Sequence, residues 1–253
     1  MPTDAIRTQS LRKEYGATVA VDGIDFAVPE GTVYGFLGPN GAGKTTTMQM
    51  LTGLMTPTGG TGTVGGASIT DRDALRPHIG YLPEEPPLFE EVTAREQLSY
   101  VAGLRDAGGP AGEERIETLL DRLDLAGDAE TRISDYSKGM RQKTAFVQAT
   151  LHDPDVLFLD EPTGGLDPRA ARTLRTLITE LADDGTTVFL STHILPVVEE
   201  LADTVGVLYD GDIVAEAPPE ELAQRADESG AGTLEDAFLE LTGDDPMATQ
   251  THG

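Results

Sequence analysis

A glycine-rich segment carries the clearest chemistry in the sequence, because it is a full match to the phosphate-binding loop pattern. Its glycines allow successive backbone N–H groups to turn towards a phosphate, and the start of the following helix adds a positive field. Lys44 is expected to reach the β- and γ-phosphates, and Thr45 to hold Mg²⁺. The sequence has no Asn-Lys-x-Asp string that would read guanine, so ATP is the expected nucleotide. The expected ATP-binding residues here are Gly38, Pro39, Asn40, Gly41, Ala42, Gly43, Lys44, Thr45 and Thr46.

Two adjacent carboxylates follow the apolar segment Val156-Leu157-Phe158-Leu159. If this segment is a buried strand of a parallel sheet, the carboxylates lie at its carboxyl edge, where phosphate ligands bind. Asp160 is then expected to bind Mg²⁺ directly or through water. Glu161 has the position of a general base that orients and deprotonates an attacking water.

Alternating strands and helices are expected to position these residues. Residues 33–37 read as a buried strand that enters the phosphate-binding loop, with a helix starting near Gly43. The apolar segment before Asp160 is followed by a helical pattern over 174–181, a strand over 187–190 and a helical pattern over 194–201. This alternation predicts an α/β fold with a mostly parallel sheet.

Weaker patterns predict the rest of the chain. Apolar residues alternate at Ile24, Phe26 and Val28, which predicts one half-buried strand. The glycine-rich stretch 59–66 is typical of a surface hairpin without chemistry. Helical spacing is present or compatible over 94–105, 116–123, 134–151 and 234–241.

The ordered motifs across residues 15–193 resemble the ATP-binding cassette (ABC) family. In Ser134-Asp135-Tyr136-Ser137-Lys138-Gly139-Met140-Arg141-Gln142 the chain is similar to the family's signature, which implies that Ser137, Lys138 and Gly139 contact ATP held by an opposite subunit. Tyr15 resembles the aromatic that stacks on adenine, although a plain strand-edge tyrosine is the alternative. Asp167, in Gly164-Gly165-Leu166-Asp167, resembles a residue that crosses the dimer interface. His193 resembles the switch histidine at the γ-phosphate; a capping or packing histidine is the alternative.

The chain departs from the family pattern at two places. Glu84, after Ile79-Gly80-Tyr81-Leu82-Pro83, stands where the family typically has Gln, and it is still expected to bind Mg²⁺ and ATP. In the signature, Lys138 replaces a Gly and Met140 replaces a Gln. Both departures resemble a branch whose cassettes pair with small hydrophobic permeases, frequently exporters.

The resemblance implies an ATPase subunit that powers transport, in the direction of export, through a separate transmembrane permease. It implies a cassette over residues 1–217, comprising a phosphate-binding-loop core, an N-terminal antiparallel region and a helical subdomain at about 84–151. Residues 218–253 then form a short acidic extension. The active sites are expected to be composite, in a head-to-tail pair with a second copy or a homologous cassette. Rival interpretations are a cassette that acts on DNA or ribosomes, and a small-molecule kinase or regulatory switch.

Composition limits these alternatives. A formal charge of −26, from 44 acidic and 18 basic residues, argues against nucleic acid as a partner. No stretch approaches the roughly 20 apolar residues of a membrane span, and the first residues do not form a secretory signal. We therefore expect a cytoplasmic chain held at the inner face of the membrane by its permease. The scattered acidic residues favour a salt-accumulating host, with an ordinary acidic protein as the alternative.

Overall fold

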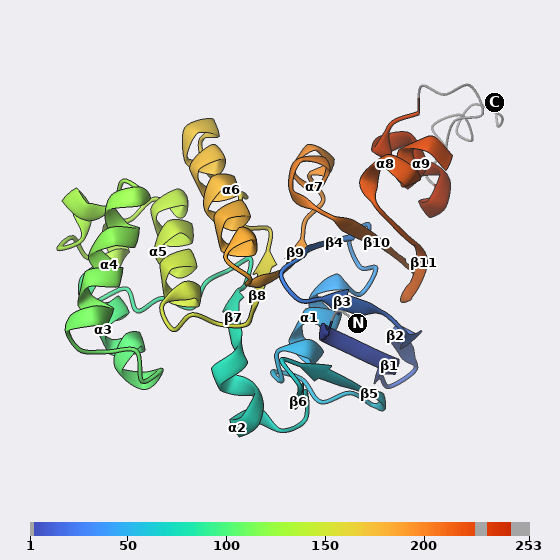
Figure 1. The fold of residues 1–253 in the computed structure, drawn as a ribbon, viewed down its shortest axis with the longest axis horizontal. Helices are drawn as coiled ribbons and strands as arrows, with labels where there is room; N and C mark the ends of the chain where they lie inside the picture. The colour runs from blue at the N-terminus through green and yellow to red at the C-terminus, as the bar shows by residue number, and fades with distance from the viewer. Residues whose placement is uncertain (1–2, 226–231, 244–253) are drawn as a thin grey trace.

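The computed structural model describes residues 3–225 and 232–243 of the chain, which form two sheets and a group of helices (Figure 1). The central sheet has six strands in the described residues, in the order β11-β10-β4-β9-β8-β7. All neighbours from β10 to β7 are parallel, and β11 is antiparallel to β10, so the predicted mostly parallel sheet is confirmed. The strands are β4 (Val33–Leu37), β7 (Ile79–Leu82), β8 (Val156–Asp160), β9 (Thr187–Ser191), β10 (Thr204–Tyr209) and β11 (Asp212–Ala217).

The second sheet is antiparallel and is formed by strands from the first part of the chain. It lies beside the central sheet (Figure 1). Glycine-rich residues 59–66 form the predicted hairpin within it. The prediction of one strand through Ile24, Phe26 and Val28 is wrong, although all three side chains are buried as expected. Two strands replace it, because one pairs with the last part of β1 and the other with its first part. The strands are β1 (Asp4–Tyr15), β2 (Thr18–Ile24), β3 (Ala27–Pro29), β5 (Gly59–Val64) and β6 (Ala67–Ser68).

The helices confirm the helical patterns of the sequence, although α4 and α6 begin before the patterns at 116–123 and 174–181, and α2 and α8 were not predicted. A helix was expected over 134–151, but it begins only at Lys138. A 3₁₀ turn at Ile133–Asp135 precedes it, Tyr136 and Ser137 are extended, and the Ser137 hydroxyl caps the helix. The helices are α1 (Lys44–Leu51), α2 (Arg72–Leu75), α3 (Ala94–Leu104), α4 (Pro110–Arg122), α5 (Lys138–Thr150), α6 (Pro168–Asp183), α7 (Leu195–Leu201), α8 (Pro219–Arg225) and α9 (Leu234–Thr242).

The inner strands β4, β8 and β9 of the central sheet are buried at every residue, so the sheet is covered on both faces there. On β8, Leu157 and Leu159 point into the cluster shared with α4, α5 and α6, whereas Val156 and Phe158 point into the cluster shared with α1 and the antiparallel sheet. The helical group α3–α5 packs beside α6, at the end of the sheet formed by β8 and β7 (Figure 1). Within the described residues, no helix combines the length and apolar character needed to cross a membrane.

The described parts of the expected C-terminal extension are α8 and α9. Leu222 and Leu234 are buried in one cluster with Val198 of α7 and Val205 and Val207 of β10. These helices therefore share a core with the edge of the central sheet. A domain boundary at residue 217 stays a prediction, as does the boundary of the helical subdomain, and residues 226–231 and 244–253 lie outside the described residues.

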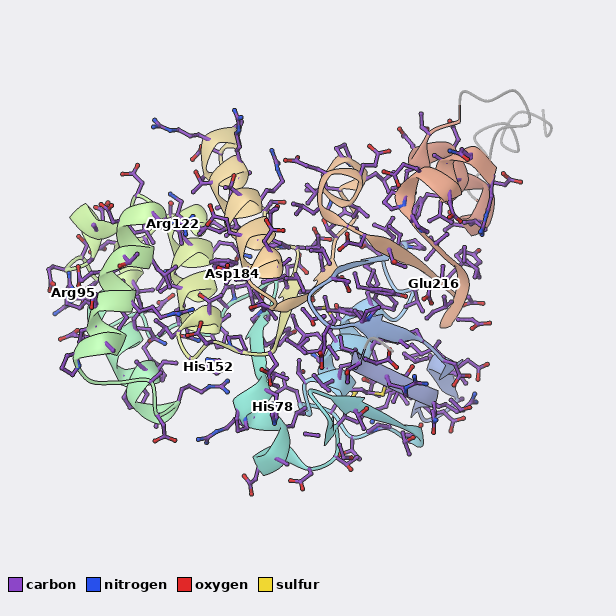
Figure 2. All side chains as sticks on the ribbon, in the orientation of Figure 1. His78, Arg95, Arg122, His152, Asp184 and Glu216 are labelled. Atoms are coloured by element: carbon purple, nitrogen blue, oxygen red, sulfur yellow. The ribbon has the colours of Figure 1, made fainter. Side chains whose placement is uncertain are left out.

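Ion pairs connect several helices on the surface of the molecule, and Figure 2 labels two of the arginines that form them, Arg95 and Arg122. Arg95 of α3 contacts Glu117 of α4 and also Glu130. Arg122 of α4 contacts Glu180 of α6, so a charged pair bridges the helical group and the core. Exposed pairs of this kind contribute about 0–1 kcal/mol each, and apolar packing therefore dominates the attachment of the helical group.

Candidate active site

The phosphate-binding loop joins β4 to α1 and needs glycine at particular positions. Gly41 and Gly43 have φ values of +85° and +111°, which other residues rarely adopt. A Cβ added to Gly43 would lie 2.4 Å from the carbonyl oxygen of Ala20, and one added to Gly38 would lie 2.4 Å from that of Leu208. The loop thus forms a backbone cradle, packed from outside, at the amino end of α1. Such a cradle fits the phosphates of a nucleotide.

Lys44 places its ammonium group inside this cradle. The ammonium donates hydrogen bonds to the carbonyl oxygens of Gly38, at 2.6 Å, and Pro39, at 3.1 Å. Burial lowers the pKa of Lys44, and the negative charges of Glu161, Asp160 and Glu84 oppose this shift. A positive charge that is partly desolvated in this way binds an anion strongly, because less hydration is lost on contact.

Asp160 and Thr45 meet at the end of β8. The Thr45 hydroxyl donates to Asp160 Oδ2 at 3.3 Å, and the Asp160 side chain is buried. Burial raises the pKa of Asp160, and the charges of Glu161 and Glu84 raise it further. No group of three or more His, Cys, Asp or Glu residues in the described part of the chain forms a metal site by itself. The hydroxyl and carboxylate oxygens here fit Mg²⁺, which usually takes few protein ligands together with phosphates and water.

Glu161 turns away from the strand that carries Asp160. Its φ is +48°, and its N–H donates to the Ser191 carbonyl oxygen at 2.8 Å. The Thr192 hydroxyl donates to Glu161 Oε2 at 2.8 Å, and the His193 N–H donates to Oε1 at 2.9 Å. His193 Nδ1 lies 2.7 Å from the same Oε1. Five other non-glycine residues in the described part of the chain also have a positive φ, so the contacts of its carboxylate, and not its backbone alone, single out Glu161.

Together these residues line a pocket of about 280 Å³, which we name the nucleotide pocket. It brings together the end of the phosphate-binding loop, the metal-binding candidates and the candidate base. Of its lining residues only Ala20 was not expected from the sequence. Gly38, Pro39 and Ala42 belong to the loop but are not among the lining residues. The lining residues are Ala20, Asn40, Gly41, Gly43, Lys44, Thr45, Thr46, Glu84, Asp160, Glu161 and His193.

Tyr15 does not line the nucleotide pocket. It ends β1, and its ring is about half exposed. Its hydroxyl donates to Met55 Sδ at 2.8 Å, and Lys13 Nζ lies 5.3 Å from the centre of its ring. Its role towards adenine therefore stays a prediction.

The signature residues line a different hollow of about 320 Å³, the signature pocket. Ser137 Oγ accepts a hydrogen bond from the Met140 N–H at the start of α5, at 3.2 Å. Asp167 caps α6 by accepting from the N–H groups of Arg169 and Ala170, bonds that lower its pKa. Among the described residues the two pockets have no lining residue in common. The signature pocket is lined by Ser137, Lys138, Gly139, Met140, Lys143, Gly165, Leu166, Asp167 and Ala170.

Sequence reasoning missed two residues that contact Glu161. One is Thr192, described above, and the other is Gln142 of α5, whose side-chain amide donates to the Glu161 carbonyl oxygen at 3.4 Å. Gln142 belongs to the signature-like string of the sequence, but nothing in that string predicts its contact with Glu161. The structure shows that the side chain is buried, which is unusual for glutamine. Thr192 stands 31 positions from Glu161, and no spacing pattern connects them.

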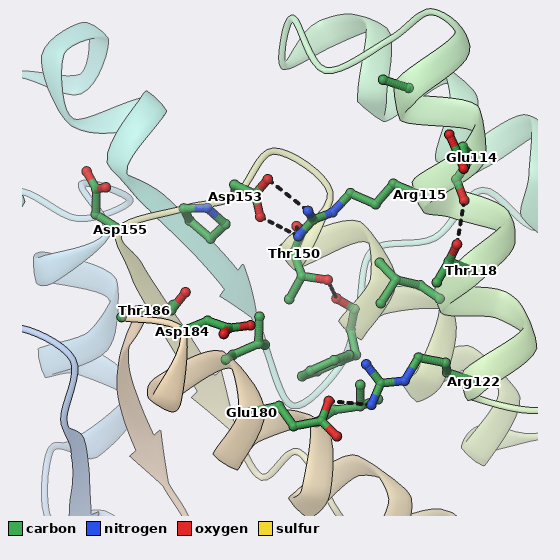
Figure 3. A pocket seen from close by; sticks show the side chains of 17 residues that line it. Glu114, Arg115, Thr118, Arg122, Thr150, Asp153, Asp155, Glu180, Asp184 and Thr186 are labelled. Atoms are coloured by element: carbon green, nitrogen blue, oxygen red, sulfur yellow. Dashed lines mark hydrogen bonds and ion pairs between the residues drawn. The ribbon is translucent and has the colours of Figure 1, made fainter.

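A larger hollow, about 680 Å³, lies elsewhere, between α4, α6 and the turn after α5 (Figure 3). Arg115 projects into it from α4 and donates to Asp153 Oδ2 at 2.8 Å and to the Thr150 carbonyl oxygen at 2.9 Å. Arg122 pairs with Glu180 across it. No residue predicted to bind ATP lines this hollow, and both arginines already have carboxylate partners, so its size alone does not make it the active site.

Comparisons with known proteins agree with this geometry. The ABC transporter family model matches residues 21–164. The bacitracin transport ATP-binding protein BcrA of Enterococcus faecalis is 38% identical over 222 residues, covering 87% of this chain and 71% of the relative. The daunorubicin/doxorubicin resistance ATP-binding protein DrrA of Streptomyces peucetius is 42% identical over 223 residues, covering 87% and 67%. A solved ATP-binding subunit of an ABC transporter superposes with a TM-score of 0.88 at 31% identity, covering 94% of this chain and 99% of the other. The chain therefore belongs to the ABC transporter family, as an ATP-binding and ATP-hydrolysing subunit.

Proposed function

We propose that the chain closes head to tail on a second cassette and that ATP hydrolysed between them drives export through a separate permease. The separation of the nucleotide pocket from the signature pocket carries this proposal. Because one chain does not bring Lys44 and Ser137 into one hollow, each site needs the signature of another subunit. The second cassette is a further copy of this chain or a homologous one.

Each residue then has a defined role in the composite site. The phosphate-binding loop and Lys44 bind the phosphates, while Thr45, Asp160 and Glu84 supply oxygens for Mg²⁺, which neutralises phosphate charge when bound. Glu161 accepts a proton from water, and His193 orients Glu161 from the adjacent strand end. Ser137, Lys138, Gly139 and Asp167 act on the nucleotide held by the partner subunit, and Tyr15 stacks on its own chain's adenine.

Charge supports this pairing of pockets. The nucleotide pocket has three carboxylates, those of Glu84, Asp160 and Glu161, against the single cation Lys44. The signature pocket has two lysines, Lys138 and Lys143, against Asp167. The whole sequence has only four lysines, so two in one hollow of an acidic protein form a local positive site. Opposite charges on facing surfaces favour the head-to-tail arrangement.

The names of the relatives support export as the direction. One relative serves bacitracin transport and another daunorubicin/doxorubicin resistance, so a permease that removes an antibiotic-like compound is the proposed partner. Such a partner would hold the chain at the cytoplasmic face of the membrane.

An exposed apolar patch supports contact with a permease. Tyr100 and Leu104 lie one turn apart on α3 and are exposed, and the exposed ring of Phe89 packs edge-on against Tyr100 at 6.2 Å. A hollow of about 350 Å³ lies next to Leu104, and its lining includes Leu54, Arg76 and Arg105. The carbonyl oxygen of Leu104 accepts a hydrogen bond from Arg76. An apolar surface with arginines fits an apolar cytoplasmic segment of the permease that also carries acidic residues.

The patch can be tested by co-purification with the permease. Tyr100→Asp should reduce recovery of the complex at least tenfold and leave ATP affinity of the free chain unchanged, since it adds a desolvated charge to an apolar contact. Val214→Asp is the matched control, because Val214 is also exposed but lies on β11. Equal recovery of the two variants would show that the permease binds elsewhere.

The composite site is tested by mixing two inactive variants in the full transporter. Lys44→Ala and Ser137→Ala homodimers each have two damaged sites and should both be inactive. In their mixed dimer both substitutions fall in one site, which leaves the other site intact, so ATP hydrolysis should reappear.

The control is the isolated heterodimer of the wild type and a chain with both substitutions, which has one defect in each site and should remain inactive. Activity in this control together with no rescue in the mixture would show that each site lies within one chain. Absence of activity in both, with mixed dimers demonstrated, would show that both sites must be intact.

A further inference from the structure

The carboxylate of Glu161 is held by two consecutive residues after β9. Thr192 donates to Oε2, whereas His193 contacts Oε1 through both its N–H and Nδ1. Only 13% of the Glu161 side chain is exposed, so these contacts largely determine its orientation. The side chain is thus tied to a strand that is far away in sequence and adjacent in the sheet.

The Thr192 hydroxyl has one orientation that satisfies all its contacts. Its oxygen accepts from the Ile194 N–H at 3.1 Å, and it has a single proton to donate. Thr192 is fully buried, and the proton is directed to Glu161 Oε2 at 2.8 Å. A buried hydroxyl that is fixed by a backbone donor acts as a rigid donor to the carboxylate.

The remaining acceptor capacity of Glu161 follows from these contacts. A carboxylate offers about four acceptor positions. His193 occupies both positions of Oε1, and Thr192 occupies one position of Oε2. One acceptor position on Oε2 is therefore left, on a residue that lines the nucleotide pocket. Without Thr192, rotation about the last torsion of Glu161 would be less restricted, because such torsions have broad minima.

We propose that Thr192 is a positioning residue for ATP hydrolysis, whose hydroxyl fixes the plane of the Glu161 carboxylate so that the free position on Oε2 receives the attacking water. This inference rests on the proposed role of Glu161 as the base. In this mechanism Thr192 contacts neither ATP nor the attacking water, and it acts only through Glu161. Correct orientation of a general base lowers the activation barrier without changing nucleotide affinity.

The test compares Thr192→Val, which removes the hydroxyl and keeps the shape, with Thr192→Ser, which keeps the hydroxyl. In the full-length chain Thr192→Val should lower kcat for ATP hydrolysis about tenfold to a hundredfold, with KM and ATP affinity within about twofold. Thr192→Ser should retain kcat within about threefold of the wild type. Should Thr192→Val fail to fold, Thr192→Ala serves the same comparison.

Thr150→Val is the matched control for loss of a buried hydroxyl. Thr150 is also buried, and its hydroxyl donates to the Phe146 carbonyl oxygen at 3.0 Å, away from the nucleotide pocket. Its kcat should equal that of the wild type. A wild-type kcat in Thr192→Val, an equal loss in Thr192→Ser, or an equal loss in Thr150→Val would each overturn the proposal.

A double-mutant comparison separates this inference from the role of Glu161. In a Glu161→Gln background, Thr192→Val should cause no further loss, because the group that it positions has been removed. If Glu161→Gln alone is active, the role of Glu161 as the base is wrong. If Glu161→Gln is inactive and Thr192→Val is fully active, only the role of Thr192 is wrong.

Discussion

Two neighbouring carboxylates in the nucleotide pocket have different surroundings, which suits them to different work. Asp160 is buried at the end of β8 and accepts a hydrogen bond from the Thr45 hydroxyl. Glu161 is bent out of the strand at φ +48° and held by the segment after β9. The two groups can therefore bind metal and accept a proton without competing for the same atom.

Glu161→Gln should retain ATP binding and lose hydrolysis by about 10²–10⁴-fold, because the amide keeps the shape but cannot accept the proton. Phosphate release measured beside equilibrium ATP binding checks this. ATP should then trap a closed dimer, visible as a doubled mass on size exclusion. Hydrolysis at a near wild-type rate would exclude Glu161 as the base.

Lys44 should make ATP binding depend on pH. Burial lowers its pKa, and a bound phosphate favours the charged form, so ATP binding should take up protons near that lowered pKa. ATP affinity should fall as the pH rises through this value. For folding the sign is opposite: the unfolded chain binds more protons between the lowered pKa and the ordinary lysine value, so the cost of burying Lys44 decreases as pH rises there.

Calorimetry in buffers of different ionisation enthalpy measures this proton uptake directly. Lys44→Arg is the control, since an arginine keeps the charge but does not release its proton. Equal proton uptake by the variant would assign the linkage to another group.

At the residue scale, the sequence was informative where the chemistry is local. Lys44 and Thr45 belong to one continuous motif, and Asp160 and Glu161 follow directly from an apolar strand, so their meeting at one sheet edge could be predicted. Thr192 could not, because its contact with Glu161 depends on the pairing of β8 with β9. The residue types at positions 160 and 192 do not reveal which strands of the sheet pair with each other.

The phosphate-binding loop depends on glycine at two positions for different reasons. Gly43 combines a φ of +111° with a close approach to the Ala20 carbonyl oxygen, whereas Gly41, at φ +85°, has open space around the position of a Cβ. Substitution of Gly41 therefore tests backbone strain alone, whereas substitution of Gly43 tests backbone strain together with steric overlap.

Gly41→Ala should lower the free energy of unfolding by about 1–2 kcal/mol, the cost of a positive φ for alanine. Gly43→Ala should cost more, because the Ala20 carbonyl must also move. Urea unfolding of the two variants checks the order. Equal losses would show that the loop relaxes freely around Gly43.

Element boundaries were less predictable than element types. The alternation of Ile24, Phe26 and Val28 specified burial correctly but could not show that β2 and β3 pair with different parts of β1. Apolar spacing alone also did not place the start of α5, which depends on the Ser137 cap. The parallel strands β4, β8 and β9 were predictable because burial on both faces leaves continuous apolar runs, whereas β7 and β10 were not predicted.

For the whole molecule, net charge should govern the response to salt. The chain has 44 acidic and 18 basic residues, and oxygen-tipped side chains project all round the ribbon (Figure 2). Salt weakens attractive pairs such as Arg122–Glu180, but each contributes little, whereas the excess of negative charge repels over the whole surface.

The melting temperature should therefore rise from dilute buffer to molar KCl, where the Debye length is about 3 Å. Sucrose at equal osmolality separates this screening from general solute exclusion. A melting temperature that stays constant or falls in KCl would refute adaptation to concentrated salt.

The contact between Gln142 and Glu161 has a consequence for the two sites of a head-to-tail pair. Glu161 serves the pocket of its own chain, whereas Ser137, at the start of the same helix as Gln142, serves the pocket of the partner subunit. Helix α5 thus connects both sites within every subunit, over only a few residues. Occupancy of one site should then alter the other, giving a Hill coefficient different from one for ATP hydrolysis. Gln142→Leu should bring that coefficient towards one, because the two sites of the transporter would then hydrolyse ATP independently of each other.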